Sequence, residues 1–196
     1  IMLVVAMTAA GILYSQVAVK DGVLSQIRQK ADYDQLTNVL NKQSFRDLVD
    51  TKLAHAGEGT KHICMMLDMD NFKLVNDTYG HQEGDKFLKK SVVIFRETLG
   101  TQAIIGRMGG DEFAVFIPGM LDKERAEAFF DRLFSNIEHI DIAEMNGKHI
   151  LLSLGACFYD GMDRITFDQL YRRADIAMYD SKKKQGYSAT IYDAKQ

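Results

Sequence analysis

Apolar residues recur along the chain at two spacings, and the two alternate after position 34. Intervals of three and four residues predict amphipathic helices, whereas short unbroken apolar runs are typical of strands buried on both faces. Four helices are predicted. The first spans about Asn41 to Ala56 and ends before Gly57, and the second carries Leu88, Val92, Phe95 and Leu99. The third begins after Asp122 and presents Ala126, Phe130, Leu133 and Ile137, and the fourth opens at Thr166 with a capping box to Gln169 and presents Phe167, Leu170, Ala174, Ala177 and Met178.

Two apolar runs and one glycine-interrupted segment predict the strands. Residues 62–70, HICMMLDMD, predict a central strand that ends in acids, and residues 149–159, HILLSLGACFY, predict another. Between them, AIIGRM (103–108) and EFAVFI (112–117) flank Gly-Gly-Asp, which predicts a tight hairpin because glycine takes positive φ without strain. The predicted fold class is therefore α/β of the α+β type, with a central, mainly antiparallel sheet flanked by helices.

The first 19 residues contain no charged side chain. A helix of this length reaches about 28 Å, close to the thickness of a bilayer's hydrocarbon core. Segment 1–19 is therefore predicted to be the end of a transmembrane helix. Thr8, Ser15 and Gln16 dilute its apolar character, so a buried soluble helix is the alternative. Because the chain does not begin with Met, we expect a further part upstream.

Residues 20–33 are predicted to form a linker helix that leads into the domain. Apolar positions spaced by three, four or seven residues suit one seam of a coiled coil, which predicts dimerisation. A single amphipathic helix lying against its own domain is the alternative, because two heptads with Lys20 on the seam do not exclude it. The seam positions are Leu13, Val17, Leu24, Ile27 and Ala31.

The composition fits one compact domain plus an extension. The chain has 196 residues, of which 46% are hydrophobic, and a formal charge of -3 at pH 7. The lack of a basic excess argues against nucleic-acid binding, although it leaves room for a pocket that takes one charged ligand. Cys64 and Cys157 lie in apolar runs without a paired metal-ligand spacing. We expect them to be reduced core residues, which argues against zinc.

Carboxylates gather at two predicted strand ends. Asp68 and Asp70 end the first apolar strand, and Asp111 and Glu112 lie at the hairpin turn. If neighbouring strands bring these ends together, the carboxylate oxygens suit Mg²⁺ or Mn²⁺. Because protein-bound Mg²⁺ usually also binds phosphate oxygens, a nucleotide would be the second ligand. The alternative is a set of ordinary turn and surface acids, which are common at strand ends.

The stretch 71–87, NFKLVNDTYGHQEGDKF, is rich in Asn, Asp and Lys. An Asp carboxylate can accept hydrogen bonds from both the ring N–H and the exocyclic amine of guanine, a donor pair that adenine lacks. The stretch therefore favours guanine, and a polar loop of turn-forming residues is the alternative. The chain has no Walker-type GxxxxGK[ST], so a triphosphate would be held by metal, lysine and backbone N–H groups.

Five ordered blocks carry a resemblance to a known family. They are DQLTNVLNKQSF (34–45), LDMDNFKLVNDTYGHQEGD (67–85), RMGGDEF (107–113), SLGA (153–156) and ADIAMYDSKKK (174–184). Together they resemble the GGDEF-domain diguanylate cyclases, with the GGDEF domain over 34–196. The resemblance implies a palm-like domain related to class III nucleotide cyclases, which joins two GTP molecules into cyclic di-GMP and releases two pyrophosphates.

The resemblance also implies roles for individual residues. In the family, acids hold the metal, an Asn and an Asp read guanine, lysines contact phosphates, and one acid helps to deprotonate the attacking 3′-hydroxyl. By position, the implied metal ligands are Asp68, the backbone carbonyl of Met69, and Asp111; the implied GTP-contacting residues are Lys73, Asn76, Asp85, Gly109, Gly110 and Lys182; and the implied catalytic residues are Glu112 and Asp111.

Two departures from the family pattern carry expectations. Gly100 and Ala103 stand where an Arg-x-x-Asp motif often forms a product-binding inhibitory site, so we expect that feedback to be absent. Gln185 and Gly186 follow the lysine run where the family usually has Gly and then a basic residue, so we expect one triphosphate contact to be missing or replaced by Lys183 or Lys184. Asp85 retains the acid expected in makers of cyclic di-GMP and favours GTP at both positions.

The leading hypothesis is a dimeric diguanylate cyclase linked to a membrane. Each domain would bind one GTP, so catalysis needs a homodimer that forms through the N-terminal helix and brings two catalytic domains face to face. The domain is expected to be cytoplasmic and tethered to the bacterial inner membrane through segment 1–19. The rival is a GTP-binding regulatory module without catalysis. A purely structural dimerisation domain would leave the polar cluster unexplained.

Overall fold

The computed structural model describes residues 20, 31–57, 59–119, 122–140, 149–162 and 164–193. Segment 1–19, predicted as a membrane span, lies outside these residues, and so does most of the linker predicted over 20–33. Within the described ranges, no helix has both the length and the apolar character needed to cross a bilayer.

One open sheet forms the centre of the described part of the chain. Its strand order is β1-β3-β4-β2-β5-β6, with antiparallel central pairs and parallel pairs at the two edges. The prediction of a mainly antiparallel sheet is confirmed. In chain order the elements are β1 (Leu40–Asn41), α2 (Lys42–Ala54), β2 (His62–Met69), α3 (Phe72–Tyr79), α4 (His81–Leu99), β3 (Ile104–Gly109), β4 (Glu112–Pro118), α5 (Lys123–Glu138), β5 (Leu152–Tyr159), α6 (Phe167–Ser181) and β6 (Ser188–Ile191).

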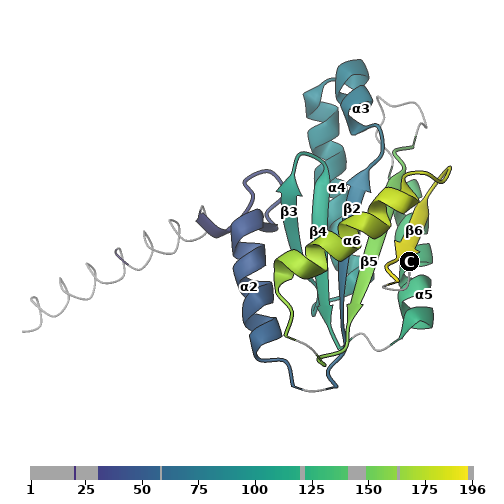
Figure 1. The fold of residues 1–196 in the computed structure, drawn as a ribbon. Helices are drawn as coiled ribbons and strands as arrows, with labels where there is room; N and C mark the ends of the chain where they lie inside the picture. Colours follow the sequence, from purple (N-terminus) through teal and green to yellow (C-terminus); the bar gives the residue numbers. More distant parts are fainter. Residues whose placement is uncertain are drawn as a thin grey trace, which may run out of the picture.

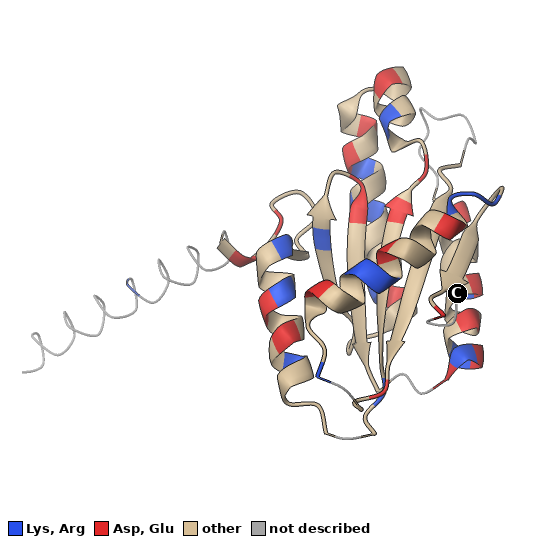
Figure 2. Ribbon diagram, in the orientation of Figure 1, with Lys and Arg blue, Asp and Glu red and all other residues tan. Residues whose placement is uncertain are grey.

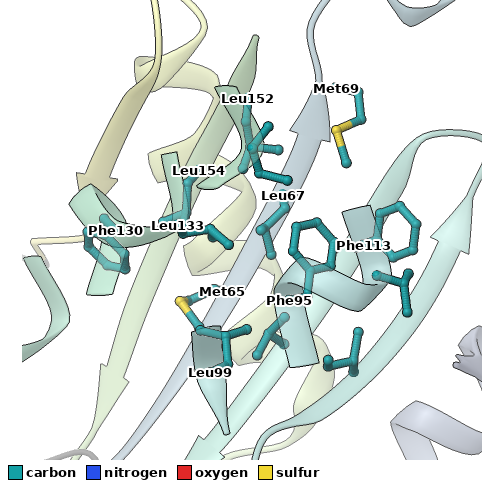
Figure 3. Close-up of a cluster of buried hydrophobic side chains, with 14 of the residues drawn as sticks. Met65, Leu67, Met69, Phe95, Leu99, Phe113, Phe130, Leu133, Leu152 and Leu154 are labelled. Atoms are coloured by element: carbon teal, nitrogen blue, oxygen red, sulfur yellow. The ribbon is translucent and has the colours of Figure 1, made fainter. Parts of the chain in front are cut away.

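Helices cover both faces of the sheet, with α2 and α6 on one face and α4 and α5 on the other (Figure 1). The central strand β2 alternates between them. Met65 and Leu67 join the core cluster that includes Phe95 on α4 (Figure 3), whereas Cys64 and Met66 pack in the cluster under α2 and α6. Burial on both faces explains why residues 62–69 read as an unbroken apolar run.

The starts of three helices follow from their capping residues, of which those of α5 and α6 were predicted from the sequence. Asn41 caps α2, and Asp122 caps α5, each by accepting a backbone N–H from the first turn. Thr166 and Gln169 form the predicted capping box of α6. These contacts satisfy backbone donors that have no partner inside the helix.

Both cysteines are free and buried, which confirms the prediction of reduced core residues. Cys64 and Cys157 are directly opposite each other across the β2·β5 pair. Burial raises the pKa of both thiols, so both are neutral at physiological pH.

The stretch 71–87 differs from the polar-loop alternative, because it forms α3 and the start of α4 with Gly80 between them at a φ of 88°. Phe72, Phe87 and Leu88 are buried and anchor both helices to the core. The edge strands β1 and β6 were not predicted, since two and four residues are too short to show a periodicity.

A close contact holds α6 on the sheet. A Cβ atom at Gly155 of β5 would lie 2.0 Å from the carbonyl oxygen of Ala174 and 2.2 Å from the backbone nitrogen of Met178. Only glycine leaves room for the helix backbone at this distance. The contact brings the C-terminal end of α6, and with it Lys182, to the end of the sheet where β2 stops.

Candidate active site

Acids from two separate strands lie side by side at one end of the sheet. Asp68 of β2 and Glu112 of β4 are direct partners in the antiparallel pair. Because residues two apart along a strand share a face, both carboxylates lie on the face covered by α6. Figure 2 shows the acidic residues at these adjacent strand ends. The predicted meeting of the two strand ends is therefore present.

Lys182 supplies a positive charge to this acidic end. It is the C-cap residue of α6, and its Nζ lies 2.8 Å from Oδ1 of Asp68. The Asp68 side chain is only 9% exposed, whereas that of Lys182 is 39% exposed. A nearly buried carboxylate requires a partner of this kind, because an unpaired buried charge is strongly disfavoured.

Negative charge exceeds positive charge around Asp68. Burial, followed by the nearby charge of Asp68, raises the pKa of Asp111 and of Glu112. Burial pulls the pKa of Lys182 down, but the hydrogen bond and charge of Asp68, together with Asp70 and Asp111, outweigh it and leave the pKa raised. The site therefore stabilises cations, and the pKa values of the Asp111 and Glu112 carboxyl groups lie above their ordinary values.

Asp70 has a different set of contacts from its neighbours. The Oγ of Ser153 on β5 lies 2.9 Å from each Asp70 carboxylate oxygen and donates a hydrogen bond to the carboxylate. Burial nevertheless raises the pKa of Asp70, helped by the charge of Asp68. Ser153 lies in the SLGA block but was not predicted to take part in the site.

The hairpin turn is shaped by glycine and clamped by Arg107. Gly110 has a φ of 43°, in the left-handed region that favours glycine. The Nε and Nη2 atoms of Arg107 both donate to the Gly110 carbonyl, at 2.8 and 2.5 Å. At Gly109 a side chain would meet no atom of the described residues within 4 Å, so this position is open to a ligand that approaches the turn.

Arg107 also ties the turn to the beginning of the domain. Its Nη1 lies 3.0 Å from Oδ1 of Asp34, and Thr37 donates to the same oxygen through its backbone N–H and its hydroxyl. Burial raises the pKa of Asp34, but the hydrogen bonds from Thr37 and the Arg107 charge outweigh it and leave the pKa lowered. Asp34 and Arg107 are separated by 73 positions, and neither was predicted to take part in the site.

A second polar group lies on α3 and α4, which extend beyond the same end of the sheet (Figure 1). Lys73 and Asn76 are on α3, and Asp85 is near the start of α4. Lys73 and Asp85 are exposed, and Asn76 is half-buried. The sequence-predicted site residues thus fall into two groups, one at the strand ends and one on this helix pair.

Comparison with known proteins identifies the family. The family model for the diguanylate cyclase GGDEF domain matches residues 31–188. The chain belongs to the GGDEF diguanylate cyclase family. The predicted family is thereby confirmed.

Relatives of this GGDEF domain agree with the assignment. It is 33% identical over 166 residues to the probable diguanylate cyclase DgcT of Escherichia coli K12, a match that covers 83% of this chain and 36% of DgcT. It is 31% identical over 160 residues to the diguanylate cyclase DosC of the same strain, covering 80% of this chain and 34% of DosC. The chain spans about a third of the length of these curated relatives.

A solved structure confirms the fold. The coiled coil and GGDEF domain of DgcB from Caulobacter crescentus, determined in complex with c-di-GMP, superposes with a TM-score of 0.82 at 27% sequence identity. The match covers 91% of this chain and 94% of that one. The mixed fold with an open six-stranded sheet between helices is therefore the fold of the family.

The acidic end of this GGDEF domain fits a divalent cation. Its donors are carboxylate and carbonyl oxygens, and the ammonium of Lys182 already lies against Asp68 as a cation would. In the described part of the chain, no group of three or more His, Cys, Asp or Glu residues is arranged to hold a metal by itself. A metal bound by Asp68, Asp111 and the Met69 carbonyl would thus depend on water and phosphate oxygens for its remaining ligands, as is usual for Mg²⁺.

Proposed function

We propose that this GGDEF domain is an active diguanylate cyclase, which condenses two GTP molecules into cyclic di-GMP and releases two pyrophosphates. The observation that carries the proposal is the pairing of Asp68 with Glu112, with Lys182 held against Asp68. Two acids with different contacts and one cation at the same strand ends are what phosphoryl transfer requires for charge stabilisation and proton removal.

The cation bound by Asp68, the Met69 carbonyl and Asp111 would be Mg²⁺ or Mn²⁺, which would stabilise charge on the α-phosphate. Glu112 accepts the proton of the attacking 3′-hydroxyl. Burial and the charges of Asp68 and Asp111 raise its pKa, which strengthens it as a base. Lys182 exchanges its carboxylate partner for a phosphate when nucleotide binds.

The second group of residues orients the substrate. Asn76 and Asp85 hydrogen-bond the guanine, and Lys73 contacts a phosphate. The open space at Gly109 and the left-handed turn at Gly110 let the backbone approach the nucleotide.

Assembly follows from the requirement for two substrates. Each domain holds one GTP, so two copies must face each other. The linker over 20–33 would join them as a homodimer, and segment 1–19 would tether the domain to the inner membrane on its cytoplasmic side. Both statements rest on the sequence pattern.

The rival function, a GTP-binding regulatory module, is favoured by one observation after α6. Gln185 and Gly186 replace the usual continuation of the lysine run, and the two lysines that were expected to compensate are already engaged. Lys183 pairs with Asp180 at 2.8 Å, and Lys184 donates to the Ala189 carbonyl and to the Thr190 hydroxyl. Weak triphosphate binding would follow from this arrangement.

Incubation of the dimeric protein with GTP and Mg²⁺ tests the proposal, with the product measured by chromatography. Glu112→Gln should lower kcat by about 100-fold or more, the usual contribution of a general base, while the affinity for GTP stays within about twofold. Glu127→Gln, an exposed acid on α5, is the matched control. GTP binding without product in the wild-type protein would establish the regulatory module, and no binding at all would overturn both functions.

A further inference from the structure

Gly84, in the first turn of α4, lies directly against Asn76 of α3. A Cβ atom at Gly84 would be 2.0 Å from Oδ1 and 3.1 Å from Cγ of Asn76, and 3.0 Å from Cζ of Phe72. Ordinary contact begins at 3.4 Å, so the Asn76 oxygen would have to retreat by about 1.4 Å. The room that the amide occupies is the room that a side chain at position 84 would fill.

The backbone conformation at position 84 does not require glycine. Gly84 is buried inside a helix and lacks the positive φ found at Gly80, four residues earlier. A helix interior favours alanine over glycine, because glycine loses more backbone freedom on folding. The contact with α3 is therefore the physical reason for glycine at this position.

Packing also sets the place of the Asn76 amide. Phe72 and Asn76 are one helical turn apart and together form the face of α3 that meets Gly84. Across the part of the chain that the structure describes, no hydrogen bond from another residue holds this amide. Its polar atoms thus remain for a ligand, while the contact with α4 fixes where they lie.

We infer that Gly84 is a positioning residue that determines base selection, by fixing where the Asn76 amide of α3 lies relative to Asp85, the next residue of α4. The inference rests on the proposed function, in which these two side chains read one guanine. Two side chains on different helices can both hydrogen-bond one planar base only if their polar atoms keep a fixed separation. A displacement of about 1.4 Å exceeds the spread of hydrogen-bond lengths, about 0.5 Å.

The inference makes Gly84 and Asn76 an interacting pair. In Gly84→Ala, the new methyl group displaces the amide and guanine recognition weakens. In Asn76→Ala, recognition is lost directly, and the shorter side chain leaves room for a methyl group at position 84. The second substitution should therefore add little to the first.

Binding of unreactive α,β-methylene analogues of GTP and ITP, measured by calorimetry, tests the selection of the base. ITP lacks the exocyclic amine of guanine, so the ratio of the two affinities reports how well the base edge is read. Gly84→Ala should weaken the GTP analogue by about tenfold or more and reduce its advantage over the ITP analogue. The double variant with Asn76→Ala should bind like Asn76→Ala alone.

Gly106→Ala is the matched control for overpacking, because a Cβ there would lie 2.6 Å from the ring of Phe45, far along the chain from α3. It should lower the melting temperature and leave the ratio of affinities unchanged. A Gly84→Ala variant with the wild-type ratio, or losses that multiply in the double variant, would overturn the inference.

Melting temperatures separate this failure from failure of the proposed function. Gly84→Ala should lower the melting temperature in the wild-type background and leave it unchanged or higher in the Asn76→Ala background. If the wild-type protein binds neither analogue, the proposed function fails, and base selection fails with it. A loss of melting temperature that disappears in the Asn76→Ala background would still support the role of Gly84 in placing Asn76. Equal losses in both backgrounds would overturn that role.

Discussion

Replacing His62 with phenylalanine should stabilise the domain, and most strongly in mild acid. His62 begins β2 at the end of the strand opposite the acids, and it is 7% exposed. Its ring lies 5.2 Å from that of Phe116 and stacks on Tyr159 at 5.9 Å, as centroid distances. Both ring nitrogens are buried and have no hydrogen-bond partner among the residues that the structure describes. A phenyl ring keeps the aromatic packing and removes these two polar atoms.

The size of the effect follows from the two unpaired nitrogens. A buried donor or acceptor without a partner destabilises the folded state by about 1–3 kcal/mol. The phenyl ring is slightly larger than imidazole, so crowding offsets part of the stabilisation gained by removing the nitrogens. We therefore expect His62→Phe to raise the free energy of unfolding by about 1–2 kcal/mol at pH 7.

Acid should enlarge this difference. Burial lowers the pKa of His62 in the folded protein, whereas in the unfolded chain it is near 6.5. As the pH falls below about 6.5, the unfolded chain takes up a proton that the folded protein excludes, so the wild type loses up to about 1.4 kcal/mol per pH unit until the folded pKa is reached. The carboxyl groups of Asp70, Asp111 and Glu112 have raised pKa values, so their titration acts in the opposite direction.

Those carboxyl contributions are present in both proteins and cancel when the variant is compared with the wild type. Urea unfolding at pH 7.5, 6.5 and 5.5 measures the difference, with His81→Phe as an exposed control. The gain in His62→Phe should grow as the pH falls from 6.5 to 5.5. A gain that is the same at all three pH values would show that the ring titrates normally in the folded state and refute the reasoning.

Two further predictions concern the acidic end. Lys182→Met removes the ammonium that lies 2.8 Å from Asp68, so Mn²⁺ should bind the nucleotide-free protein about tenfold more tightly, as measured by electron paramagnetic resonance. Lys183→Met is the control, and equal or weaker Mn²⁺ binding in Lys182→Met would contradict the competition. In Arg107→Lys, the single lysine nitrogen cannot replace the three guanidinium nitrogens that contact Gly110 and Asp34. The free energy of unfolding, measured in urea, should therefore fall by about 1–2 kcal/mol. An unchanged unfolding midpoint would contradict this role of Arg107.

Local pattern alone was sufficient for much of the fold and for the family. The starts of α2, α5 and α6 were predictable because a cap and the first turn it satisfies lie within four residues of each other. The strand β2 was predictable because burial on both faces requires an unbroken apolar run. The metal, guanine and phosphate roles of the site residues stay predictions from the resemblance.

Only the tertiary structure decided which side chains meet. Ser153 lies 83 positions from its partner Asp70, and the pairing of Asp68 with Glu112 depends on a strand register that one residue of slip would reverse. The sequence determined helices and strands, because these form from contacts between near neighbours. It did not determine the contacts that build the site, such as that of Gly84 with Asn76, because they depend on how completed elements pack against one another.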